Sequence, residues 1–100
     1  MTKAHLYMID VKSPDPTVGA AVFKKEQKKI NLAVKRGIKK TLEKNGLSEE
    51  FAFAEKRVSN LSRCFQVYAS HRAAKVLREV AGITRVDQMI FSAYALSINL

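Results

Sequence analysis

The sequence predicts a single α+β domain over residues 1–100, and three observations support this. Segments rich in aromatic and β-branched residues are interspersed with two segments of helical period. Compact domains cluster at about 100–150 residues, so a chain of 100 residues is one domain rather than two. Apolar residues make up 47% of the chain and charged residues 27%, a composition typical of a folded globular domain.

The first predicted element is a strand over residues 4–12. It ends at Ser13-Pro14-Asp15-Pro16, where the two prolines prevent further strand pairing. Alternation along a strand places Tyr7, Ile9 and Val11 on one face and Leu6, Met8 and Asp10 on the other. The charge of Asp10 marks the second face as the one nearer to water.

A helix is predicted over residues 18–45, because apolar side chains recur there at spacings of four and seven. Those side chains are Phe23, Ile30, Val34, Ile38 and Leu42. Gly46 follows as a stop signal. Residues 22–45 hold nine basic and two acidic residues, a net of +7 within a chain total of +9. At about 100° per residue, eight basic side chains fall on the arc opposite the apolar ones: Lys24, Lys25, Lys28, Lys29, Lys35, Arg36, Lys39 and Lys40.

Residues 50–70 admit two interpretations. A hairpin would have strands over 51–58 and 63–69, joined by a turn at 59–62. A single long helix from Ser48 is the alternative, because residues 49–57 are rich in alanine, glutamate and lysine. The hairpin is favoured, because the run from Cys64 to Tyr68 is a poor helix former.

A short second helix is predicted between Ser70, a good N-cap residue, and Gly82, a C-terminal stop signal. The tail over 83–100 is apolar with one acidic residue and looks extended, either free or completing the sheet. The element order is that of a ferredoxin-like βαββαβ sandwich, an antiparallel sheet with two helices on one face. Its open sheet face would show Leu6, Met8, Gln66 and Tyr68, with Cys64 beside them.

Several classes of protein are excluded or disfavoured. No apolar run approaches the roughly 20 residues that span a membrane, and the opening segment is too short for a signal peptide. The lone Cys64 forms no internal disulfide, so we expect a cytoplasmic protein. Cys64 and His71 lack a third, orienting group, and no metal-ligand spacing or phosphate-binding loop is present. The sequence therefore predicts a binding protein without catalytic residues, metal or cofactor.

The basic arc of the first helix supports a nucleic-acid-binding module as one function. Eight positive side chains on one helix face are the electrostatic pattern of a phosphate-binding surface. A lysine-rich face that only keeps a small protein in solution explains the same pattern. Both interpretations remain open at this point.

The run from Val58 to Asp87 resembles the subtilisin propeptide-like inhibitor family, the prodomains of subtilases and their free-standing relatives. The strand of that family matches Phe65, Val67 and Ala69, and its short helix matches Ala73, Ala74 and Leu77. After that helix, the family has a segment that runs from a glycine to an acidic residue and begins the last strand. Residues 82–87 match this segment. The opening residues 6–12 also look like the family's first strand.

The resemblance implies a ferredoxin-like fold and an inhibitor of a subtilisin-type serine protease. The open sheet face would pack on the protease, and the tail Ser97, Ile98, Asn99 and Leu100 would lie in the substrate cleft as an added strand. No reaction is catalysed. Three alternatives remain: the nucleic-acid module, a structural subunit of a larger complex, and a homodimer whose tail completes its own sheet.

Overall fold

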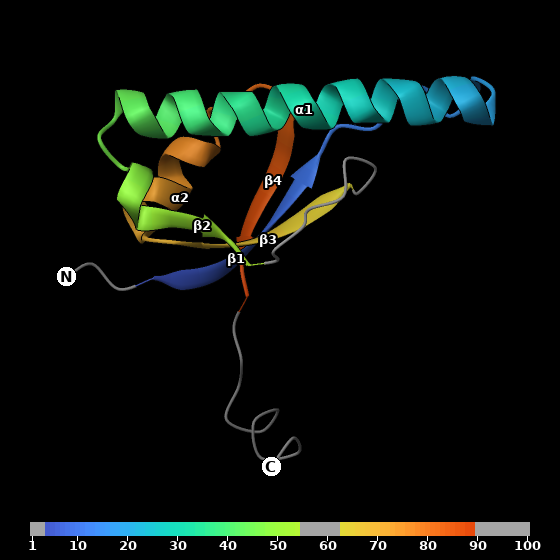
Figure 1. The fold of residues 1–100 in the computed structure, drawn as a ribbon. Coiled ribbons are helices and arrows are strands. Elements are labelled where there is room, and N and C mark those ends of the chain that lie inside the picture. Colours follow the sequence, from blue (N-terminus) through green and yellow to red (C-terminus); the bar gives the residue numbers. More distant parts are fainter. Residues whose placement is uncertain (1–3, 55–62, 90–100) are drawn as a thin grey trace, which may run out of the picture.

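The computed structural model describes residues 4–54 and 63–89 (Figure 1). The elements are β1 (His5–Val11), α1 (Ala20–Lys44), the short 3₁₀ turn η1 (Ser48–Glu50), β2 (Phe51–Phe53), β3 (Cys64–Ala69), α2 (His71–Leu77) and β4 (Ile83–Gln88). The four strands form one antiparallel sheet in the order β2-β3-β1-β4. This confirms the predicted ferredoxin-like α+β fold.

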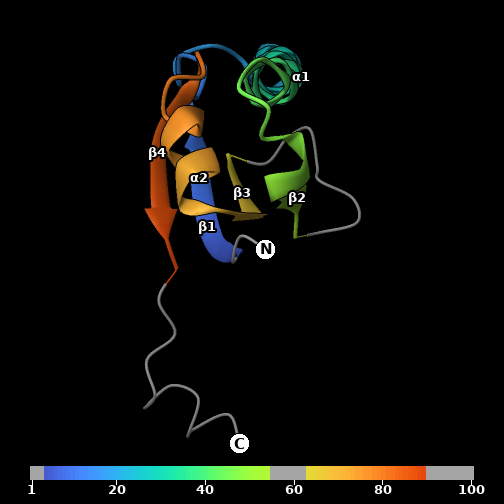
Figure 2. The same ribbon diagram turned by 90° about the vertical axis from the view of Figure 1, so that its left-hand side faces the viewer.

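Both helices pack on the same face of the sheet and enclose the core between them and the strands (Figure 2). Alternation along the strands fills this face with apolar side chains. The strands contribute Tyr7, Ile9, Val11, Phe65, Val67, Ala69 and Val86, and the helices contribute Val34, Ile38, Leu42, Ala73, Ala74 and Leu77. Burial of these side chains is the main source of stability, at roughly 1.5–3 kcal/mol for each large one.

Helix α1 is long for a domain of this size. Its 25 residues extend for about 37 Å, and its buried side chains all lie between Gln27 and Leu42. The part before Gln27 therefore extends beyond the sheet (Figure 1). Gln27 is held where the helix meets the sheet, because its side-chain amide donates to the Lys12 carbonyl at 3.2 Å and to Asn31 at 3.0 Å.

Two glycines allow α1 to approach the turn after α2. A Cβ at Gly37 would lie 2.9 Å from Val80 Cγ1, and one at Gly82 would lie 2.7 Å from Val34 Cγ2. Gly82 also has φ of 92°, a conformation that side chains with a Cβ rarely adopt. The predicted second helix reached residue 81, but α2 ends at Leu77. It ends early because the turns over 78–82 bury Val80 against α1.

Residues 51–53 and 64–69 form strands, so the alternative of one long helix is wrong. β2 pairs antiparallel with β3, with Phe51 opposite Ala69 and Phe53 opposite Val67. The predicted first strand over 51–58 is described only as far as Ala54, and β2 itself ends at Phe53. The predicted turn at 59–62 lies outside the described residues. Residues 83–88 of the predicted tail complete the sheet as β4, and residues 90–100 lie outside the description.

An ion pair ties the start of α2 to the turn before β2. Arg72 Nε donates to Glu50 Oε1 at 2.9 Å, and Arg72 Nη2 donates to the other carboxylate oxygen. The hydrogen bond from Arg72, and after it one from Ser70, lowers the pKa of Glu50 below its usual value. The ionised carboxylate is therefore the form that the fold favours.

We expect Glu50→Gln to lower stability at neutral pH and to have less effect in acid. A lowered pKa in the folded state contributes stability above the unfolded-state pKa of about 4.3. That contribution is lost as the pH falls through the lowered pKa that Glu50 has in the folded protein. Urea unfolding midpoints at pH 7 and pH 3 measure the difference. The control is Glu49→Gln, the same change at an exposed neighbour. If Glu50→Gln lowers the unfolding midpoint equally at pH 7 and pH 3, the ionised Glu50 carboxylate does not stabilise the fold.

Candidate functional site

The sheet face opposite the helices is not covered by any described element (Figure 1). The strand register arranges its side chains in three rows across the sheet. The first row is Ala52, Tyr68 and Leu6, the second Gln66, Met8 and Asp87, and the third Cys64, Asp10 and Arg85. We call these nine residues the helix-free face. The predicted residues Leu6, Met8, Gln66 and Tyr68 all lie on it.

Polarity changes along the helix-free face. The first row is apolar, and Tyr68 at its centre is 48% exposed. The third row carries the charges of Asp10 and Arg85, and Arg85 forms an ion pair with Asp87 in the second row. One end of the face therefore offers an aromatic and an aliphatic side chain, and the other end offers charges.

The apolar row lies beside the last described residue, Met89. Pairing between β1 and β4 continues to Met89, whose amide donates to the Leu6 carbonyl at 2.8 Å. Met89, the last described residue, therefore lies beside Leu6, at the apolar end of the helix-free face. The predicted tail Ser97, Ile98, Asn99 and Leu100 lies outside the described residues.

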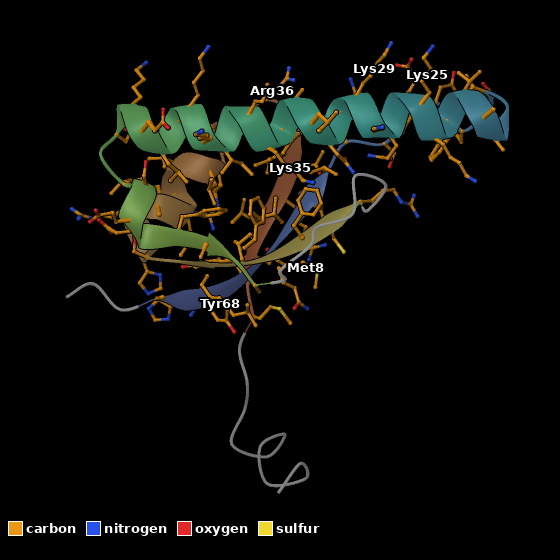
Figure 3. The ribbon with its side chains drawn as sticks, in the orientation of Figure 1. Met8, Lys25, Lys29, Lys35, Arg36 and Tyr68 are labelled. Atoms are coloured by element: carbon orange, nitrogen blue, oxygen red, sulfur yellow. The ribbon has the colours of Figure 1, made fainter. Side chains whose placement is uncertain are left out.

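Most of the predicted basic arc lies on the outer side of α1. Lys25, Lys29 and Arg36 point away from the sheet, whereas Met8 and Tyr68 point in the opposite direction (Figure 3). Seven of the eight predicted basic side chains are exposed: Lys24, Lys25, Lys28, Lys29, Arg36, Lys39 and Lys40. The exception is Lys35.

Lys35 turns toward the core instead of the solvent arc, which corrects the sequence-based assignment. Its ammonium lies 5.6 Å from the centre of the Phe65 ring, and partial burial lowers its pKa. The sequence carried the signal for this position. Lys35 precedes Ile38 by three residues and Leu42 by seven, so it lies at the border of the apolar stripe.

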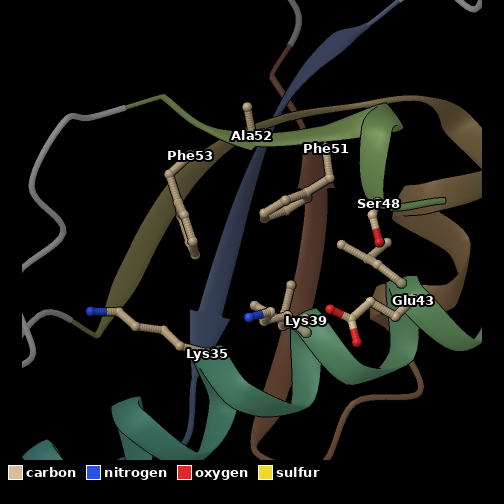
Figure 4. A pocket seen from close by; sticks show the side chains of 9 residues that line it. Lys35, Lys39, Glu43, Ser48, Phe51, Ala52 and Phe53 are labelled. Atoms are coloured by element: carbon tan, nitrogen blue, oxygen red, sulfur yellow. The ribbon is translucent and has the colours of Figure 1, made fainter.

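A groove of about 370 Å³ opens between α1 and β2 beside this lysine (Figure 4). Phe51 and Phe53 direct their rings toward the helix, with Ile38 and Leu42 on the helix side. Lys39 and Glu43 also line it, so the groove combines apolar walls with charges of both signs.

The two candidate catalytic side chains do not meet. Cys64 begins β3 and His71 follows its end, and six strand residues extend for about 20 Å. His71 stacks on His5 with 4.1 Å between ring centres, and its Nδ1 shares a hydrogen bond of 2.6 Å with the Tyr7 hydroxyl. These contacts fasten α2 to β1. They do not form a nucleophile–base pair.

Residues 4–54 and 63–89 hold neither a metal-binding cluster nor a membrane-spanning helix. No three His, Cys, Asp or Glu side chains there are grouped so that they could hold a metal ion. None of the described helices is long and apolar enough to cross a membrane.

Comparison with known proteins identifies no relative: no protein-family model, curated protein or solved structure matches this chain. The function of the chain is therefore inferred from its surfaces. Sequence reasoning placed six residues on the helix-free face (Leu6, Met8, Asp10, Cys64, Gln66 and Tyr68) but did not include Ala52, Arg85 and Asp87. Their place depends on the register of β2 and β4, which pairs them with residues far away in sequence.

Proposed function

We propose that this chain is a non-catalytic inhibitor of a subtilisin-type serine protease that docks through its helix-free face. The observation that carries the proposal is the apolar row of Ala52, Tyr68 and Leu6 beside Met89, with Tyr68 exposed at its centre. Large aromatic side chains that are exposed on a regular surface are frequent anchors of protein interfaces.

The residues that match the subtilisin propeptide-like inhibitor family support the proposal, because they form the core and leave the other strand face for a partner. Phe65, Val67 and Ala69 of β3 all face the core, as do Ala73 and Leu77 of α2. The matched pattern is therefore the one that builds this half of the sandwich. The alternate strand positions are left to contact a partner.

The proposed mechanism joins two contacts. The helix-free face packs on the protease, and the segment after Met89 runs from the apolar row into the substrate cleft. There Ser97 to Leu100 pair with the protease main chain as an added strand, with apolar side chains in its pockets. The sheet contact holds this segment in place, so it stays in the cleft as a bound product does.

Titration of a subtilisin-type protease with the full chain tests the proposal. We expect loss of peptide hydrolysis at one inhibitor per protease, with the inhibitor intact by mass spectrometry while inhibition lasts. Unchanged hydrolysis at micromolar inhibitor across several subtilisin-type proteases would overturn the proposal.

Removal of Ser97 to Leu100 tests the role of the tail. Burial of a leucine is worth roughly 1.5–3 kcal/mol and each strand hydrogen bond about 1 kcal/mol, so inhibition should weaken at least ~100-fold. The melting temperature should stay the same, because the partner alone orders these residues in this mechanism. The homodimer alternative gives the opposite result: lower stability and a shift toward monomer, without any effect on a protease.

A further inference from the structure

The outer side of α1 carries a line of cations that the inhibitor proposal does not use. We call the four side chains Lys25, Lys29, Arg36 and Lys40 the basic ridge. All four are exposed, and exposed Lys24, Lys28 and Lys39 flank them. The α1 helix holds nine basic and two acidic residues, so its net charge is +7, whereas the remainder of the chain sums to +2. The charge of the chain is thus concentrated on one helix.

The spacing of the basic ridge suits a chain of phosphates. At about 1.5 Å per residue, the steps from Lys25 to Lys29 and from Arg36 to Lys40 are each about 6 Å. The step from Lys29 to Arg36 is about 10 Å, and the whole ridge from Lys25 to Lys40 spans about 22 Å along α1. One strand of a nucleic-acid duplex carries a phosphate every ~3.4 Å along its axis, so the ridge covers about six of them.

We propose that the basic ridge binds the phosphate backbone of double-stranded DNA, independently of base sequence. The major groove of B-form DNA is about 12 Å wide and admits an α-helix. The flanking lysines spread the positive charge to the side of the ridge, toward phosphates at the edge of such a groove. Most side chains of the basic ridge and its flanks are lysines. A lysine binds phosphate as a point charge and does not provide the planar, bidentate hydrogen bonding of arginine.

Two other polyanions fit the ridge less well. Proteins that bind single strands stack bases on aromatic side chains, and none of the ridge or flanking residues is aromatic. Helices that lie on membranes bury a continuous apolar face, whereas the exposed large apolar residues of α1 are Val22 and Leu32, ten positions apart. Duplex DNA needs neither feature.

The ridge and the helix-free face lie on opposite sides of the molecule (Figure 3). The part of α1 before Gln27 also extends beyond the sheet, so Lys25 can be approached without contact with the strands. DNA on the ridge therefore leaves the helix-free face open to a protein. This proposal stands whether or not the chain inhibits a protease.

Fluorescence anisotropy with a 20-base-pair duplex of random sequence, from 50 to 200 mM NaCl, tests the proposal. Four phosphate contacts, one for each ridge cation, predict a log–log slope of about −3.6, which is a loss of affinity of about 150-fold over this range. The variant Lys25→Gln, Lys29→Gln, Arg36→Gln and Lys40→Gln should bind at least ~100-fold more weakly at 50 mM and flatten the slope by about 3–4 units. Glutamine is a good helix former, so circular dichroism should confirm an unchanged fold.

A second variant with the same charge change provides the control. Its substitutions, Lys12→Gln, Arg63→Gln, Lys75→Gln and Arg85→Gln, lie at exposed positions outside α1, and we expect it to keep affinity within a few-fold. Equal losses in the two variants would overturn the proposal, because they would reflect net charge alone. Three other results would also overturn the proposal. They are no duplex binding at 50 mM NaCl, tighter binding of the single strand than of the duplex, and binding of anionic phosphatidylserine vesicles without binding of DNA.

Discussion

Replacement of both Met8 and Tyr68 by glutamate is expected to weaken inhibition of a subtilisin-type protease at least ~100-fold. Interface anchors typically contribute 2 kcal/mol or more each, and every 1.4 kcal/mol is about a factor of ten in affinity. A carboxylate on the helix-free face also loses its water on docking. Both side chains point away from the core, so the melting temperature should change little. The inhibition constant and a thermal melt measure the two effects.

Leu32→Glu provides a control for the effect of a new surface carboxylate. Leu32 is an exposed apolar side chain on α1, away from the sheet, so its replacement tests a new carboxylate outside the helix-free face. We expect unchanged inhibition. If the Met8 and Tyr68 variant inhibits as well as the natural chain, the sheet does not dock, even where removal of the tail still weakens binding.

Gly82→Ala is expected to lower the free energy of unfolding by about 3 kcal/mol. The left-handed backbone there costs a residue with a Cβ roughly 1–2 kcal/mol, and overpacking of a core typically costs another 1–3 kcal/mol. The second cost arises because the new Cβ would lie 2.7 Å from Val34 Cγ2. Urea unfolding measures the total.

Gly46→Ala separates the two costs. Gly46 also has a positive φ, of 66°, but a Cβ there would meet nothing within 4 Å. We expect a loss of about 1 kcal/mol at this position, from the backbone alone. Equal losses at Gly46 and Gly82 would show that Val34 moves aside without cost and that the contact between α1 and the turn is loose.

Local patterns predicted most of the fold. The alternation in β1 and the four- and seven-residue spacing in α1 are carried by residues that lie close together in the sequence. The ends of β2 and α2 were less well predicted, because tertiary contacts decide them. α2 stops at Leu77 since Val80 packs against Gly37, more than forty positions earlier in the chain.

The candidate site, like the fold, was predictable only where local patterns determine it. Alternation alone indicated that Leu6, Met8, Gln66 and Tyr68 share a face. The division of that face into an apolar and a charged end could not be read from the sequence, because it depends on which residues of β2 and β4 lie opposite β1 and β3. Lys35 was misplaced although its spacing from Ile38 and Leu42 put it at the border of the apolar stripe, where its ammonium lies 5.6 Å from the centre of the Phe65 ring.

The central place of β1 in the sheet has a consequence during synthesis. Its two neighbours are β3 and β4, and the hydrogen bond from Thr84 to the Asp10 carbonyl joins residues 74 positions apart. At roughly 5–20 residues per second, β1 leaves the ribosome about 3–10 s before β3 exists. During that interval α1 can form from local hydrogen bonds alone, and its lysines repel other nascent chains. The net charge of +7 on α1 therefore opposes association between such chains during the interval in which β1 has no strand to pair with.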